Sequence, residues 1–153
     1  MENLMQRQKS IIISSLNSNN LPEISYAPFV MVDNNIYVYL SKAANHYYNL
    51  SKNKNCSLMI IEDEKDSKTI FARERVTFEG EAVKLGSVDE CVFDKFDEVH
   101  GDSMMSVLKK MDFDMFKIGI KKGRYVKGFG QAFDIIFKAG KYELVHVTDI
   151  GHK

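Results

Sequence analysis

The chain has 153 residues, enough for one domain with a hydrophobic core of its own. Lysine and arginine together number 21, as do aspartate and glutamate, so the formal net charge is zero and nucleic acid is disfavoured as a partner. No apolar run approaches the roughly 20 residues that a membrane-spanning helix needs. We therefore expect neither nucleic-acid nor membrane partners.

The chain carries two cysteines, Cys56 in the apolar run CSLMII and Cys91 in ECVFDKF. They form no Cys-x-x-Cys pair, and the first residues do not resemble a secretory signal. This cysteine usage is typical of a reducing compartment, so we expect a cytoplasmic location.

The N-terminal segment, residues 1–20, is predicted to form one amphipathic helix. Its periodic pattern covers residues 3–19, and the Asn-rich NSNN before Pro22 would end the helix. The apolar residues of this pattern are Leu4, Ile11, Ile12 and Leu16.

Residues 21–148 are predicted to form a β-rich domain. Two β-rich runs within residues 23–40 flank Asp33–Asn35, which tolerate left-handed turn geometry, so a hairpin is expected there. A short helix should follow Ser41, a candidate N-cap, and the run CSLMII predicts the next strand.

A long antiparallel strand is predicted over residues 69–85, because TIFARERVTFEGEAVKL alternates over more than a dozen positions. Phe71, Arg73 and Arg75 would then lie on one side of the strand. The two arginines could grip acidic groups of a ligand side by side.

A helical insertion is predicted near residues 88–111. Ser87 and Glu90 form a capping-box signature for its first helix, and Asp102 or Ser103 can cap a second one.

The last third of the sequence returns to a β pattern. It runs through FKIGIKKGRYVKGFGQAFDIIFK and, after a turn at Ala139–Lys141, through YELVHVTDI. The glycines of GRYVKGFG lie within β-rich sequence and open no helix, which favours a bulged strand over a dinucleotide-binding loop.

These elements predict a mainly β fold with peripheral helices. About six or seven antiparallel strands would close into a small split barrel, because closure leaves no exposed strand edges. Residues 149–153 would form a short C-terminal tail.

Four segments resemble a known group of proteins. YLSKAANHYYNLSKNKNCSLMII and FARERVTFEGEAVKL are similar to the pyridoxamine-5′-phosphate-oxidase-like, FMN-binding split-barrel clan. GRYVKGFGQAF and the terminal GHK narrow the resemblance to the HugZ-type haem-degrading oxygenases of that clan. The resemblance covers residues 21–153 and implies a homodimeric split barrel with its cofactor site at the subunit boundary.

The resemblance implies a set of cofactor-binding residues. In FMN-binding members, the strand-to-helix junction and an arginine of the long strand hold the flavin phosphate, for which free backbone N–H groups and a guanidinium fork are suited. The same fork suits a haem propionate. The matching residues are Ser41, Lys42, His46 and Asn49 at the junction, with Arg73 or Arg75 on the strand.

The terminal DIGHK implies an iron ligand. In HugZ-type proteins a histidine of the C-terminal tail is the axial ligand of haem iron, and His152 matches that position. An axial imidazole usually donates its other ring N–H to an acceptor. The resemblance places Asp114 in that role, approaching from the partner subunit.

The leading hypothesis is a homodimer that takes haem as both cofactor and substrate. It would open the haem ring oxidatively with electrons from an external donor, releasing iron and a biliverdin-type product. Two alternatives stay open: an FMN-binding oxidoreductase, and a haem carrier without catalysis.

Overall fold

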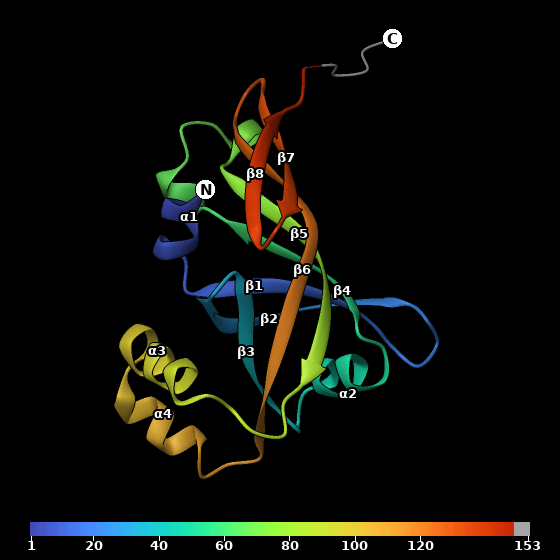
Figure 1. The fold of residues 1–153 in the computed structure, drawn as a ribbon, viewed down its shortest axis with the longest axis vertical. Coiled ribbons are helices and arrows are strands. Elements are labelled where there is room, and N and C mark those ends of the chain that lie inside the picture. Colours follow the sequence, from blue (N-terminus) through green and yellow to red (C-terminus); the bar gives the residue numbers. More distant parts are fainter. Residues whose placement is uncertain (149–153) are drawn as a thin grey trace.

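The computed structural model describes residues 1–148. They form four α-helices and eight strands (Figure 1). The helices are α1 (Glu2–Arg7), α2 (Asn45–Lys52), α3 (Glu90–His100) and α4 (Asp102–Leu108). The strands are β1 (Ser10–Leu16), β2 (Pro22–Val32), β3 (Asn35–Ser41), β4 (Asn55–Ile61), β5 (Arg75–Lys84), β6 (Phe113–Gly128), β7 (Gln131–Lys138) and β8 (Lys141–His146).

Six of the strands close into an antiparallel barrel in the order β3-β2-β1-β4-β5-β6. Closure comes from β6, whose first residues pair with β3 while its residues 116–126 run beside β5. β7 and β8 extend the sheet from the far part of β6. The prediction of a mainly β split barrel with peripheral helices is therefore confirmed.

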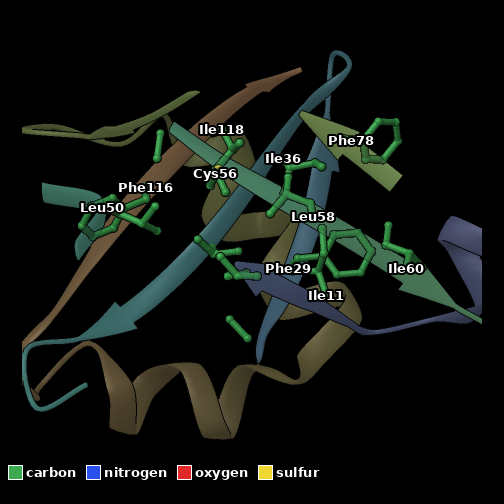
Figure 2. Close-up of a cluster of buried hydrophobic side chains, with 14 of the residues drawn as sticks. Ile11, Phe29, Ile36, Leu50, Cys56, Leu58, Ile60, Phe78, Phe116 and Ile118 are labelled. Carbon is green, nitrogen blue, oxygen red and sulfur yellow. The ribbon is translucent and has the colours of Figure 1, made fainter. Parts of the chain in front are cut away.

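Apolar side chains fill the barrel from opposing strands. Ile11, Leu58 and Phe116 are at most 2% exposed, and Figure 2 shows them with neighbours that also point into the core. Each such side chain contributes about 1.5–3 kcal/mol by leaving water. A second cluster, including Phe96 and Met105, lies between the barrel and α3–α4.

The prediction of one N-terminal helix over residues 1–20 is wrong. Only Glu2–Arg7 is helical, and Ser10–Leu16 is strand β1. Ile11 and Ile13 are fully buried at a spacing of two residues, and β1 pairs with β2 and β4. Isoleucine is β-branched and favours a strand, and this strand is paired along both of its edges.

The prediction of a strand over residues 69–85 is wrong at its start. Ile70–Ala72 is a 3-10 turn, and β5 begins only at Arg75. The Glu62 carboxylate accepts the Glu74 N–H at 2.8 Å, and the Arg73 guanidinium donates to the Glu62 carbonyl oxygen. These contacts fix the chain before the strand, so Arg73 and Arg75 do not share a strand face.

The other predicted elements form with shifted bounds. The two insertion helices are present as α3 and α4, but α3 starts at Glu90 with Asp89, not Ser87, at its N-cap. The β-rich run after α4 divides into β6 and β7 at Phe129–Gly130, where Gly130 has φ +66°. The register shifts between Val126 and Gly128, so the predicted irregularity of this strand is confirmed.

No helix within residues 1–148 combines the length and the apolar character that crossing a membrane would demand.

Substitutions at two glycines of β6 would test how tightly the barrel is packed. A Cβ at Gly123 would lie 2.5 Å from the Thr77 carbonyl oxygen and 2.8 Å from Phe78 Cδ1. Gly123→Ala should therefore lower the free energy of unfolding by about 2 kcal/mol or more in chemical denaturation. At Gly119 nothing lies within 4 Å, so Gly119→Ala should change it by less than about 0.5 kcal/mol. Equal effects of the two substitutions would contradict this packing.

Candidate functional site

The predicted site residues fall at opposite ends of β6. Ser41 pairs with Phe113 at the start of β6, whereas Arg75 pairs with Val126 near its end. The contour between these points is roughly 40 Å, at about 3.3 Å per residue. Figure 1 shows α2 near one end of β6 and the β7–β8 hairpin at the other. One chain therefore does not bring the two groups together.

The four residues around α2 do not form one anion cradle. His46 Nδ1 lies 2.9 Å from Ser25 Oγ, and Asn49 donates to Ser15 and to the Glu23 carboxylate, at 3.1 and 2.7 Å. Their cavity of about 370 Å³ includes Glu23, which would repel a phosphate. Burial lowers the pKa of His46, which also disfavours its cationic form.

Ser41 and Lys42 do not line that cavity. Ser41 ends β3 and is not the N-cap of α2, a position taken by Ala44. The Ser41 hydroxyl accepts the Ala43 N–H at 3.1 Å, and Lys42 is exposed. The sequence pattern alone could not separate these two side chains from His46 and Asn49.

Asp114 lies at the same end of the barrel, as the second residue of β6. Its Oδ2 accepts a hydrogen bond from the Tyr47 hydroxyl. Tyr47 is 4% exposed, and its pKa is raised to about 12 because its hydroxyl donates to Asp114, with burial adding to the effect. Asp114 is therefore held by a side chain of α2.

Arg73 and Arg75, which lie near the other end of β6, have different contacts. The Arg73 guanidinium donates to the Glu62 carbonyl oxygen and lies 3.8 Å from the Glu64 carboxylate. Arg75 donates to the Arg73 carbonyl oxygen at 3.1 Å and reaches a cavity that Arg73 does not line. Of the two, only Arg75 lines this cavity.

That cavity, which we call the arginine groove, has a volume of about 570 Å³. Among its lining residues are Phe71, Arg75, Arg124, Phe129, Gln131 and Val147. The Phe71 and Phe129 side chains are 88% and 71% exposed, which is costly for aromatic rings without a partner. Aromatic walls beside guanidinium groups suit a flat apolar ligand with anionic substituents.

Sequence reasoning missed Phe71, Phe129 and Arg124 as candidates. Arg124 lies in GRYVKGFG and is held by Asp134 at 2.9 and 3.1 Å. The turn that separates β6 from β7 carries Phe129 to the groove, and the 3-10 turn carries Phe71 there. Only the position of these turns, which the periodicity did not reveal, could have identified the two aromatic residues.

A larger cavity of about 690 Å³ lies between α1, β2 and α3. None of the predicted site residues lines it. Its charged lining residues are Glu2, Asp33, Glu98 and Lys95, so carboxylates predominate and an anionic cofactor is disfavoured.

The predicted iron ligand His152 lies outside the described residues. The last described segment passes the arginine groove, where the Val147 N–H donates to the Ala132 carbonyl oxygen at 2.8 Å. Within residues 1–148, no three His, Cys, Asp or Glu side chains are grouped so that they could hold a metal ion.

Comparison with known proteins gives a family and named relatives. The family model described as pyridoxamine 5′-phosphate oxidase matches residues 1–127. The chain is 34% identical over 133 residues to "Heme oxygenase HutZ" of Vibrio cholerae, covering 85% of this chain and 76% of that protein.

Two solved structures share the fold closely. ChuZ of Campylobacter jejuni superposes with a TM-score of 0.83 and 31% identity over 95% of this chain, which spans only 60% of ChuZ. HutZ of Vibrio cholerae, described as a heme storage protein, gives a TM-score of 0.76 and 28% identity, covering 83% of this chain and 92% of HutZ.

The Tyr47–Asp114 hydrogen bond predicts how stability depends on pH. The folded protein keeps the Tyr47 proton up to a pKa of about 12, whereas an unfolded chain releases it near 10. The stability that this proton contributes is complete below about pH 10 and is lost as the pH rises toward 12. In urea unfolding at pH 9, 10 and 11, Tyr47→Phe should lose less stability than the wild type.

Tyr48→Phe is the matched control, because the Tyr48 hydroxyl makes no hydrogen bond within the described residues. It should keep the wild-type dependence. The same loss in Tyr47→Phe as in the wild type would contradict the assignment.

Proposed function

This chain belongs to the pyridoxamine 5′-phosphate oxidase family, and from that premise we propose that it binds haem and opens the haem ring oxidatively. The products would be iron and a biliverdin-type tetrapyrrole. The proposal is supported by the 34% identity to a protein named heme oxygenase, and the site observation that carries it is the arginine groove.

The groove has the chemistry that haem requires. Haem is a flat apolar ring with two propionates, and burying Phe71 and Phe129 against it would remove two exposed aromatic side chains from water. Arg75 would bind a propionate through its guanidinium. Arg124 would add positive charge, although Asp134 already pairs with it. The residues present therefore fit haem.

His152 is proposed to ligate haem iron in the groove of its own chain. It follows Val147, which lines the groove, by five residues, so the backbone between them spans at most about 18 Å. A neutral imidazole is a common axial ligand of haem iron.

Asp114 is proposed to reach this imidazole from a second copy of the chain. It lies near the start of β6, roughly 40 Å along the strand from the groove, a separation that the tail cannot cover. The site is therefore incomplete in one chain, and a two-fold dimer would build two equivalent sites.

Bound haem would supply the iron that activates O₂, with the electrons coming from an external donor. The chain's own residues would then have three tasks. Arg75 would anchor the ring, the phenylalanines would keep water from its face, and Asp114 would accept the N–H of the His152 imidazole and fix its orientation.

Two alternatives remain, each with one supporting observation. The family match supports an FMN-binding oxidoreductase, but Glu23 in the cavity with His46 and Asn49 counts against a phosphate there. The description of the Vibrio cholerae structure as a heme storage protein supports a haem carrier. We also propose a cytoplasmic location, in keeping with the unpaired Cys56 and Cys91.

Hemin titration followed by absorbance is the first test. Hemin should bind with a shifted Soret band that decays when ascorbate and oxygen are added, and FMN should not compete. His152→Ala should change the Soret spectrum, and Arg75→Ala should weaken hemin binding about tenfold, the cost of one charge-assisted hydrogen bond. Lys122→Ala, which removes an exposed charge on β6, is the control and should bind normally.

The hemin and FMN titrations distinguish the oxygenase from the two alternatives. A Soret band that is stable under ascorbate and oxygen would leave a carrier and exclude the oxygenase. Tight FMN binding without hemin binding would favour the flavoprotein.

Mixing two variants tests whether the site is shared between copies. Random exchange of His152→Ala and Asp114→Asn chains makes about half of the dimers mixed, and each of these has one intact site. About a quarter of the wild-type haem-degrading activity should therefore return. The control mixes wild type with the double variant His152→Ala/Asp114→Asn, whose mixed dimers should have no intact site.

A site in which His152 and Asp114 act within one chain predicts the reverse result for both mixtures. The single variants would then fail to complement, and the mixed dimers of the control would keep one intact site.

A further inference from the structure

We propose that Tyr47 is a positioning residue that orients Asp114 toward the iron-ligating imidazole of a second copy. The inference rests on the proposed function, because it assigns a role in the same composite site. Neither the sequence pattern nor the comparisons point to Tyr47. It follows from the contacts that hold its phenol ring and from the atom that its hydroxyl reaches.

The ring of Tyr47 is fixed by its neighbours. Its centroid lies 5.3 Å from that of Phe116 at an interplanar angle of 83°, and 5.2 Å from that of Tyr48. Lys84 Nζ lies 5.4 Å from the centroid of the same ring. Packing and a cation–π contact thus leave the hydroxyl one direction in which to point.

That direction is toward Asp114. The Tyr47 hydroxyl donates to Asp114 Oδ2, and no group within residues 1–148 hydrogen-bonds to the second oxygen, Oδ1. A carboxylate with one oxygen held has lost most of its rotational freedom. Its remaining oxygen is a preorganised acceptor for one N–H donor.

The Tyr47–Asp114 pair is anchored by two separate elements of the fold. Asp114 is half-buried at the start of β6, and its backbone position is set by pairing with Leu40 of β3. Tyr47 comes from α2, a different element. Two independently anchored segments therefore fix the carboxylate, whereas an aspartate on a strand end alone could turn toward solvent.

The experiment uses full-length hemin-loaded protein and compares Tyr47→Phe with wild type, Asp114→Asn and Tyr48→Phe. The readouts are hemin affinity and the iron–histidine stretching band of the ferrous form in resonance Raman spectra. This band reports how strongly the axial imidazole donates its ring N–H, because that donation raises the basicity of the ligand. Phenylalanine keeps the ring contacts and removes only the hydroxyl.

Tyr47→Phe should lower the stretching frequency in the same direction as Asp114→Asn, and by less. It should also weaken hemin binding by roughly tenfold. The double variant Tyr47→Phe/Asp114→Asn should match Asp114→Asn alone, because Tyr47 acts only through Asp114. Tyr48→Phe should match the wild type.

An unchanged frequency in Tyr47→Phe, with a lowered one in Asp114→Asn, would overturn the role of Tyr47 and leave the proposed function standing. Failure of the wild type to bind hemin would overturn the proposed function itself. Additive effects of the two substitutions in the double variant would likewise overturn it, because they would show that Tyr47 does not act through Asp114.

Discussion

The architecture depends on the continuous pairing of β6. This single strand, Phe113–Gly128, closes the barrel against β3, runs the length of β5 and then carries β7. Gly123 lets it pass close to β5, where a side chain would meet the Thr77 carbonyl oxygen. Because a strand is stiff and extended, the same pairing sets a fixed separation between the residues at its two ends.

That separation is the reason why the proposed site needs a second copy of the chain. Arg75 and the aromatic walls of the groove lie at one end of β6, and Asp114 with Tyr47 at the other. The junction before β5 is rigidly held, since Glu74 accepts from Arg7 and Tyr125 while Glu62 accepts the Glu74 N–H. The groove is thus part of a fixed framework, and in the proposed site the iron ligand and its hydrogen-bond acceptor would come from the C-terminal tail and from a second copy.

The sequence revealed the strand-rich class, the hairpin at Asp33–Asn34 and the helical insertion, because alternation and turn residues are local signals. It did not reveal β1, since seven residues with three consecutive isoleucines fit a helix or a strand until their partners are known. It also did not reveal that Arg73 turns toward Glu62, a contact between residues eleven positions apart. The sequence did not identify Phe71 and Phe129 either, because turns bring them to the groove and periodicity does not predict where those turns lie.

The central claim is that haem binds where two copies of the chain meet. Sedimentation velocity over a dilution series, with detection at both the protein and the Soret wavelengths, tests it most directly. The account predicts that Soret absorbance sediments only with the dimer, at one hemin per chain, and that hemin shifts the monomer–dimer equilibrium toward the dimer. Soret absorbance that sediments with the monomer at full occupancy would contradict it.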